Sequence, residues 1–161
     1  MKKNTSQSYS AIQLFWLTAL RVLIGWHFLY EGLVKLVNPN WSSVGYLVDS
    51  RGFMQQFFEW LAARPGTLQV VDFANIWGLI LIGAGLLLGF LTKPALWAAT
   101  VMLGFYYLSH PPFVGLNYNL PTEGSYLIVN KVLIELVAVV VLMVFPASRR
   151  IGLDRLIHKS K

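Results

Sequence analysis

Long apolar runs, separated by shorter polar segments, dominate the pattern of residues along this chain. The four longest lie at about residues 12–36, 73–91, 94–110 and 126–145. A helix needs about 20 residues to cross roughly 30 Å of hydrocarbon, and three of the four runs reach or approach that length. The third run is shorter, but it has prolines at its first position and just after its end, where prolines suit the limits of a helix. The pattern therefore predicts four membrane-spanning helices.

The long segment between the first two runs, residues 37–71, has a helical pattern of its own. Within 53–61 the apolar side chains recur on one helical face, and they are Phe53, Met54, Phe57, Phe58 and Leu61. The opposite face carries Gln55, Gln56 and Glu59. We expect an amphipathic helix here that lies on the outer membrane surface or caps the bundle.

Composition agrees with a membrane protein. Of the 161 residues, 56% are hydrophobic and only 12% are charged, whereas a soluble domain needs more polar surface. The length suits a single domain spanning residues 1–161. We therefore predict an all-α, integral membrane four-helix bundle. The chain has no cysteine, which excludes disulfides and thiolate metal sites.

The net charge of +6 is explained by membrane topology rather than by nucleic acid, because the basic residues form no patch with interleaved aromatics. With both termini in the cytoplasm, the inner side carries Lys2, Lys3, Lys93, Arg149, Arg150, Arg155, Lys159 and Lys161. The outer side then carries only Lys35, Arg51 and Arg64. This asymmetry predicts an N-in, C-in orientation, with a short cytoplasmic lead before a retained first helix.

The second run contains four glycines, Gly78, Gly83, Gly85 and Gly89. Small residues let helix backbones approach closely in lipid. They predict close packing within the bundle or, alternatively, a dimer face.

Ionisable residues interrupt the first run. At 100° per residue, Arg21, His27, Glu31 and Lys35 fall within an arc of about 120°, so they share one helix face. A charge in the middle of a membrane costs on the order of 2.5–3.5 kcal/mol, so these groups are expected to face the interior, to pair, or to reach the interface. Arg21 lies near the inner end, where it can extend to the surface.

The fourth run supplies partners at matching depth. Counted from the outer ends of the two helices, Glu31 lies level with Lys131, and His27 lies level with Glu135. We therefore predict one polar cluster from these four residues, with Asn130 beside it in sequence. Three further polar residues near the outer helix ends are candidates for its mouth, and they are Asp72, Asn75 and His110.

The cluster is open to two interpretations. It can be a set of paired charges that holds the helices in register, or a site for a polar head group and proton transfer. A haem is not expected, because the three histidines lie at different depths. A metal bound by His27, Glu31 and Glu135 is a weaker alternative. Around Tyr107 and His110, the aromatic residues suit either an interfacial belt or the wall of a site for a flat ring.

Several segments together resemble the DoxX/DoxD family of small four-helix membrane proteins. The first is "LRVLIGWHFLYEGLVKL", in which Arg21, Gly25, Gly32 and Lys35 match the family spacing. The others are "GLILIGAGLLLGFLTKPALWAA" and "NKVLIELVAVVVLMVFPASRRIGLD". The segments "NPNWSSVGYL" and "YYLSHPPF" are similar to the DoxD-type branch. The resemblance covers about residues 20–156.

This resemblance implies a membrane subunit linked to quinone chemistry, similar to the membrane component of thiosulfate:quinone oxidoreductase. It implies a second protein subunit, a bacterial or archaeal cytoplasmic membrane, and a quinone as ligand. The residues themselves predict no flavin, haem or metal on this chain. In that case His27, Glu31, Lys131 and Glu135 bind the head group and move protons. The remaining candidates for quinone binding are Arg21, Lys35, Asp72, Asn75, Tyr107, His110 and Asn130.

A second hypothesis stays open beside it. The chain can be a non-catalytic assembly or scaffold subunit, with or without homo-oligomerisation, whose buried charges only hold the fold. A transporter is less well supported, because no inverted repeat or broken helix is evident.

Overall fold

The computed structural model describes residues 9–121 and 127–158, and within these ranges the chain is mostly helical and contains no β-strand. The elements in chain order are α1 (Ala11–Val37), α2 (Val44–Val48), α3 (Gln55–Ala62), α4 (Pro65–Leu88), α5 (Thr92–Ser109), α6 (Lys131–Val144), the 3-10 helix η1 (Ala147–Arg149) and α7 (Asp154–His158). The predicted all-α class is confirmed for these residues.

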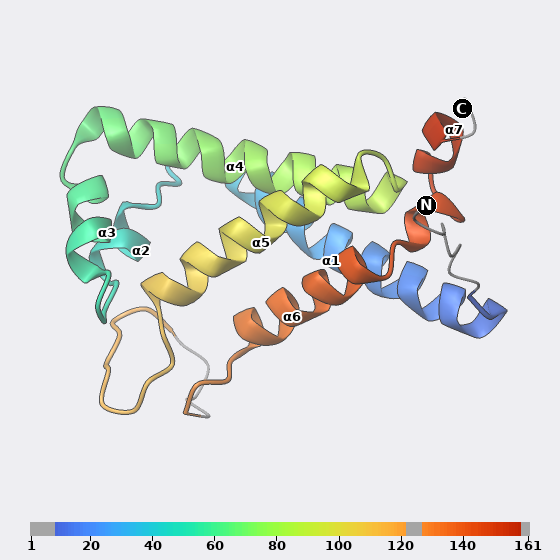
Figure 1. The fold of residues 1–161 in the computed structure, drawn as a ribbon. Helices are drawn as coiled ribbons and strands as arrows, with labels where there is room; N and C mark the ends of the chain where they lie inside the picture. The colour runs from blue at the N-terminus through green and yellow to red at the C-terminus, as the bar shows by residue number, and fades with distance from the viewer. Residues whose placement is uncertain (1–8, 122–126, 159–161) are drawn as a thin grey trace, which may run out of the picture.

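The short helices mark the two ends of the molecule. In Figure 1, α2, α3 and the loop after α5 lie at one end, here named the α2 end. The start of α1 and α7 lie at the other, the α7 end. The two ends of the described chain are therefore on one side of the molecule. Which compartment that side faces stays a prediction, and Lys2, Lys3, Lys159 and Lys161 lie outside the described residues.

A reciprocal cap sets the start of α1. The Ser10 hydroxyl accepts a hydrogen bond from the Gln13 backbone N–H at 3.2 Å, and the Gln13 side chain accepts one from the Ser10 N–H at 2.9 Å. This pair satisfies two N–H groups that the first turn of a helix leaves without intrahelical partners. The helix agrees with the predicted 12–36 to within one residue at each end.

α4 begins well before the predicted residue 73. Pro65 occupies its first turn, where the missing N–H costs no hydrogen bond, and the helix continues from there without interruption. It ends at Gly89, which has a φ of 61° and takes the left-handed conformation that favours glycine. The predicted span of 73–91 is thus shifted, and the outer segment predicted at 37–71 is shorter.

The last two long helices differ from their predicted bounds to unequal degrees. α5 lies within two residues of the predicted 94–110. α6 begins only at Lys131, because the Asn130 side chain accepts a hydrogen bond from the Leu133 N–H at 2.9 Å and caps the helix there. The predicted start at Tyr126 lies outside the described residues.

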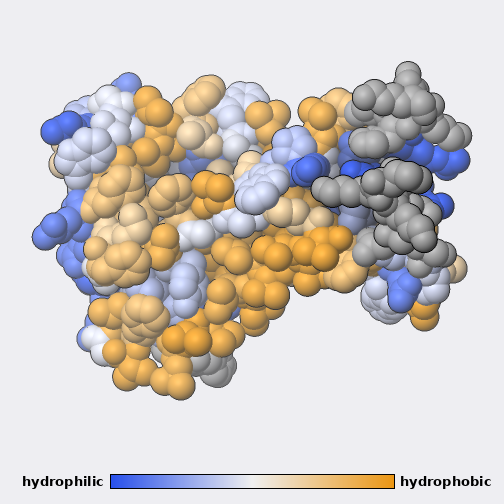
Figure 2. Space-filling model, in the orientation of Figure 1, coloured by the Kyte–Doolittle hydropathy of each residue, from blue (hydrophilic) through white to orange (hydrophobic). Residues whose placement is uncertain are grey.

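Within the part of the chain that the structure describes, two helices, α1 and α4, are long and apolar enough to cross a membrane. α6 has 14 residues, so at 1.5 Å per residue it extends about 21 Å, which is less than the roughly 30 Å of a hydrocarbon core. Figure 2 shows apolar side chains over most of the middle of one face and hydrophilic ones gathered toward its two ends. The predicted four spans are therefore supported for two helices.

The helix predicted in the outer segment is present as α3, and the structure adds the short α2 before it. Phe58 is buried and packs edge-on against Phe105 of α5, with ring centroids 6.5 Å apart. Phe57 also contacts Phe105, although it remains partly exposed. α3 therefore packs on the end of α5, which is the capping alternative.

Glycines bring α1 and α4 into close contact. A Cβ added at Gly25 would lie 2.9 Å from the Leu87 backbone nitrogen, and one added at Gly83 would collide with the backbone of Leu29. Two turns further toward the α2 end, a Cβ at Gly32 would lie 2.7 Å from the Ile80 side chain. These glycines pack within one molecule, which is the first of the two roles predicted for the small residues of this segment.

The hydrophobic core is shared by α1, α4, α5 and α6. Its buried members are Ile24, Phe28, Leu79, Ile82, Leu86, Leu96, Ala99, Leu103, Val139 and Leu142. These side chains separate the polar groups at the α2 end from those at the α7 end. The molecule therefore has two separate polar regions.

Candidate functional site

A cavity of about 540 Å³ lies among α1, α4, α5 and α6 toward the α2 end. Its wall combines two kinds of side chain. The apolar ones include Phe28, Leu79, Leu103, Leu120 and Val132. The ionisable and hydrogen-bonding ones include His27, Glu31, Lys35, Tyr46, Asn75, Tyr106, Lys131 and Glu135. Cavities of this volume and mixed lining are typical of small-molecule sites.

The His27–Glu135 pair joins α1 to α6 at the edge of the cavity. The imidazole Nδ1 lies 2.7 Å from Glu135 Oε1, so Nδ1–H donates to the carboxylate. The His27 side chain is 52% exposed, whereas that of Glu135 is 15% exposed. Because Nδ1 is engaged, Nε2 is the nitrogen left to meet a ligand. The predicted pairing of these two residues is confirmed as a contact.

Lys35 is at the centre of a second polar group. Its ammonium donates to Asn75 Oδ1 at 3.2 Å and lies 3.8 Å from the Glu31 carboxylate. The Asn75 amide donates in turn to the Tyr106 hydroxyl at 2.7 Å. The ammonium also lies 5.2 Å from the centroid of the Trp41 ring, within cation–π range. Lys35 is thus a hydrogen-bond donor fixed at the cavity wall.

All four residues predicted to carry the chemistry line this one cavity. Glu31 contacts Lys35 on its own helix, one turn away, and Lys131 occupies the first position of α6. The direct pairing of Glu31 with Lys131 stays a prediction. The expectation that the four residues gather in one place, from helices at opposite ends of the chain, is met by the geometry.

Asp72, Tyr107 and Asn130 lie outside the cavity lining and have local structural contacts. Asp72 accepts hydrogen bonds from the side chain of Ser42 and from the backbone and side chain of Ser43, which are themselves part of the cavity wall. The Tyr107 hydroxyl donates to the Ile128 carbonyl at 2.7 Å, away from the cavity. Asn130 caps α6 as described above. These residues hold the frame of the site and do not face its interior.

His110 is also outside the lining, in a cluster that closes the α2 end. Its ring is stacked between Tyr46 and Tyr118, with centroid distances of 4.0 and 4.8 Å. Its Nε2 lies 3.7 Å from Asp49 Oδ2. The stack brings His110 into contact with Tyr46, which does line the cavity. A role for His110 beside a ligand ring stays a prediction.

Asp49 anchors the loop after α5 over the cavity. It is 4% exposed and accepts hydrogen bonds from the Asn119 N–H, the Asn119 side chain and the Leu120 N–H, at 2.8–2.9 Å for the shortest contacts. Burial alone would raise the pKa of Asp49, but these hydrogen bonds outweigh it and lower the pKa below its ordinary value. The carboxylate thereby holds Leu120 at the cavity wall.

Three aromatic residues of the site were not among the sequence candidates. Tyr106 belongs to a run that also suited an interfacial belt, and only its contact with Asn75 separates it from its neighbour Tyr107. Trp41 and Tyr46 lie in the segment after α1, where no long periodic pattern exists to orient side chains. The helix spacing of Leu103 and Tyr106, three positions apart, is the one signal that could have placed Tyr106 on the inner face.

Among residues 9–121 and 127–158, no three His, Asp or Glu side chains converge to form a candidate metal site. Each of the two polar clusters in the cavity contains one basic and one acidic side chain. His27 lies beside Glu135 in the first, and Lys35 lies beside Glu31 in the second. Such an arrangement can donate hydrogen bonds to a ligand oxygen and exchange protons with it.

A model of the DoxX family matches residues 16–111, which is more than half of the chain. The chain belongs to the DoxX family. This is a membrane-associated family and, with the two apolar helices α1 and α4, it indicates an integral membrane protein. No curated protein and no solved structure matches the chain.

The residues matched by the DoxX model form only part of the cavity wall. It includes the α1, α4 and α5 parts of the wall, with His27, Lys35, Asn75 and Tyr106, and it ends before α6. Glu135, the partner of His27, therefore lies outside the matched segment.

In this DoxX protein Arg21 is at the α7 end, remote from the cavity, and a role for it in ligand binding stays a prediction. It is 3% exposed, and its guanidinium donates to the Ile151 carbonyl at 2.8 Å. It also lies against Gly89 and Gly152, where an added Cβ would come within 2.8 and 3.1 Å of Nη1. The residue expected to reach the surface instead docks the segment that follows α6.

The same segment of the DoxX protein is fixed by Asp154. Its carboxylate accepts from the Thr92 N–H at 3.2 Å, and its own N–H donates to the Gly89 carbonyl at 2.7 Å. Burial would raise the pKa of Asp154, but hydrogen bonds from Thr92 and Ser148 outweigh it and lower the pKa. Arg21 and Asp154 together form a latch, defined here as the contacts that hold residues 151–154 on the turn between α4 and α5.

Proposed function

We propose that this DoxX protein is the membrane subunit of a quinone-linked oxidoreductase and that the cavity binds the quinone head group. The observation that carries the proposal is the mixed lining of the cavity, which combines apolar side chains with polar groups held in place by hydrogen bonds. A quinone ring has flat apolar faces and two carbonyl oxygens at opposite edges. The apolar side chains suit the faces, and the two polar groups suit the edges.

The polar groups have different roles in this proposal. Lys35 and the Tyr106 hydroxyl donate to one carbonyl, and Asn75 holds both in position. His27 meets the other carbonyl through Nε2, with its ring oriented by Glu135. Reduction of a quinone to a quinol takes up two electrons and two protons. His27 supplies one proton and the Lys35–Glu31 pair supplies the other.

The electron donor is the narrower part of the proposal. The segments similar to the DoxD-type branch support thiosulfate, of which two molecules lose one electron each to form tetrathionate. A second protein subunit would bind the donor. Thiosulfate as the electron donor is supported by resemblance, whereas the head-group site is supported by the geometry of the cavity. Either proposal can therefore be disproved without the other.

We also propose that α5 and α6 cross the membrane beside α1 and α4, with both termini in the cytoplasm. The asymmetry of basic residues supports this orientation. The chain has no cysteine, so single cysteines introduced at Asn40 and Arg155 give an unambiguous test. A membrane-impermeant thiol reagent should label Asn40→Cys in intact cells and Arg155→Cys only after lysis. The reverse pattern would overturn the orientation.

The head-group proposal is tested by quinone binding to the purified full-length protein. Tyr106→Phe removes one donor and should weaken binding of a water-soluble quinone analogue about tenfold, equivalent to about 1.4 kcal/mol. Tyr30→Phe is the matched control, because Tyr30 is 55% exposed on α1 and does not line the cavity. Equal affinity in Tyr106→Phe, Tyr30→Phe and the unmodified protein would contradict the proposal.

A scaffold role is the second candidate, and one observation favours it. His27 with Glu135, and Lys35 with Asn75 and Glu31, satisfy one another without any ligand. If the contacts only hold the helices, Glu135→Gln should lower the thermal midpoint and leave the activity of the assembled enzyme unchanged at equal protein level. A loss of activity with an unchanged midpoint would exclude this candidate.

A further inference from the structure

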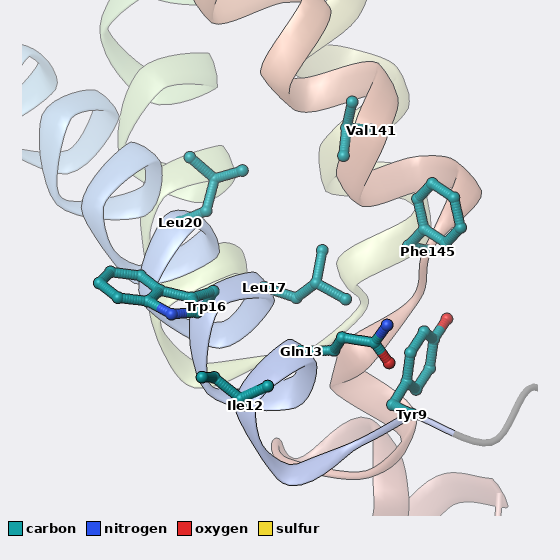
Figure 3. Close-up of a pocket in the computed structure, with 8 residues that line it drawn as sticks. All are labelled: Tyr9, Ile12, Gln13, Trp16, Leu17, Leu20, Val141 and Phe145. Atoms are coloured by element: carbon teal, nitrogen blue, oxygen red, sulfur yellow. The ribbon is translucent and has the colours of Figure 1, made fainter.

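A second hollow of about 700 Å³ lies between α1 and α6, closer to the α7 end than the cavity. Figure 3 shows Leu17 and Leu20 of α1 on one side of it and Val141 and Phe145 of α6 on the other. None of the residues that line it is charged. This hollow is named the groove.

The groove and the cavity lie on the same face of α1. At 100° per residue, Gln13, Leu17 and Leu20 of the groove fall within an arc of about 80° that also contains His27 and Glu31 of the cavity. Both hollows also include residues of α6, at its start for the cavity and at its end for the groove. The contact between α1 and α6 therefore has two hollows, one after the other along the helix axes.

The distance between the two hollows is short. Leu20 and His27 are seven positions apart on α1, which corresponds to about 10 Å along the helix axis. Leu23, between them, is 66% exposed, whereas Ile24 and Val139 are buried beneath. An apolar chain that leaves the cavity at His27 can thus follow an apolar surface into the groove, and reaching Gln13 takes about 21 Å.

We propose that the groove receives the isoprenoid tail of a long-chain quinone whose head group lies in the cavity, an inference that rests on the proposed function. His27 is half-exposed at the junction, within a helix that can span the membrane. Leaving its polar ring against hydrocarbon is costly, so a head group that covers it is favoured there. The same ligand then buries its tail between α1 and α6. A soluble ligand such as thiosulfate gains nothing from an uncharged groove.

The experiment compares two analogues with the same head group, one without a tail and one with a long isoprenoid tail. Their dissociation constants are measured on the purified full-length protein in the same lipid nanodiscs. Leu17→Trp fills the groove from α1, and Leu33→Trp is the matched control, because Leu33 is 42% exposed and lines neither hollow. The tail partitions into lipid equally with every variant, so this contribution cancels when the affinities of the variants are compared.

The expected result is that Leu17→Trp reduces the affinity gained from the tail about tenfold, while binding of the tail-less analogue is unchanged. Leu33→Trp should leave both affinities unchanged. If Leu17→Trp does not fold, Val141→Phe fills the groove from α6 and carries the same expectation.

Two other outcomes are distinguishable. If the tail-less analogue binds but the gain from the tail is equal in Leu17→Trp and Leu33→Trp, the groove proposal is overturned and the head-group site stands. If neither analogue binds any variant, the proposed function itself is overturned. Disulfide cross-linking of Leu17→Cys between two copies of the chain would identify the groove as a dimer face and overturn the tail assignment.

Discussion

His27 and Glu135 are separated by 108 positions in the sequence, and the imidazole N–H of one donates to the carboxylate of the other across 2.7 Å. The contact links α1 with α6 at the edge of the cavity. It engages Nδ1, so the half-exposed ring offers Nε2 to the space between the helices. The pair therefore combines a helix–helix contact with an oriented group for binding.

A double-mutant cycle on this pair is the first prediction. His27→Ala and Glu135→Ala should each weaken binding of a quinone analogue about tenfold, and the double variant should lose little more than either single one. The reason is that Glu135 acts on the ligand by orienting His27. Isothermal titration of purified variants gives the three affinities.

Additive losses would show that the two residues act separately and would contradict the positioning role of Glu135. Thermal midpoints of the same variants separate this result from a scaffold role. In the scaffold case the midpoints fall and the affinities do not.

The second prediction concerns the contact of α1 with α4. Gly83→Ala should destabilise the protein by about 3 kcal/mol, because the added methyl group meets the backbone of Leu29 and cannot be relieved by a side-chain rotation. Gly104→Ala is the matched control. It lies in α5 with no atom within 4 Å of the added methyl, so it should be neutral or stabilise by about 0.5–1 kcal/mol.

The free energy of unfolding of both variants can be measured by titration with a denaturing detergent. Equal stability of Gly83→Ala and Gly104→Ala would show that α1 and α4 do not approach as closely as described.

The third prediction concerns the latch at the α7 end. Arg21→Met removes the donor to the Ile151 carbonyl and should destabilise the docked segment by about 2 kcal/mol, the scale of a hydrogen bond from a charged group. Limited proteolysis should then cut near residues 149–155 sooner than in the unmodified protein. Binding of a head-group analogue should be unchanged, because Arg21 is remote from the cavity.

Arg51→Met is a suitable control for this experiment, since Arg51 lies in the segment after α2, at the opposite end of the molecule. An unchanged cleavage rate in Arg21→Met would show that Asp154 alone holds the segment. Loss of analogue binding would return Arg21 to the ligand site.

The fourth prediction is a pH dependence of stability from Asp49. Its pKa is lower in the folded protein than the ordinary 3.8, so the folded state favours the charged form. The resulting stability is present above the ordinary pKa and is lost as the pH falls through the lower, folded pKa. Thermal midpoints should therefore fall below about pH 4, where the unfolded chain takes up the proton first.

Asp49→Asn removes this contribution and should lower the midpoint at neutral pH while making its decline below about pH 4 less steep. Asp154 titrates in the same direction and is unchanged in both proteins, so the difference between the two curves reports Asp49. Parallel curves would contradict the assignment.

Much of the architecture was predictable from the sequence for local reasons. The bounds of α1 follow from its apolar run and from a cap formed by Ser10 and Gln13, three positions apart. The common face of His27, Glu31 and Lys35 follows from helix geometry alone. Even the contact of His27 with Glu135 was accessible, because a membrane places both helices on one depth scale.

The partners of other candidate residues could not be predicted, because they depend on neighbours distant in sequence. Arg21 shares the face of the cavity residues, but the chain after α6 returns to the α7 end and supplies Ile151 as its partner. Asp72 and His110 lie at the expected end of the helices. There Asp72 accepts a hydrogen bond from Ser42, and the ring of His110 stacks on that of Tyr46. Periodicity reports the face of one helix and says nothing of the loops that cover it.

The sequence by itself thus determined the helical class, the apolar character of the long helices and the charged stripe on α1, since each depends on residues a few positions apart. Only the tertiary structure decided which polar groups share a cavity. It paired Asn75 with Tyr106 and stacked Tyr46 on His110, contacts set by how α2, α4 and α5 pack against one another. It also aligned the groove with the cavity along α1 and α6. The physical reason is that side-chain contacts between helices depend on their mutual packing, which no local pattern specifies.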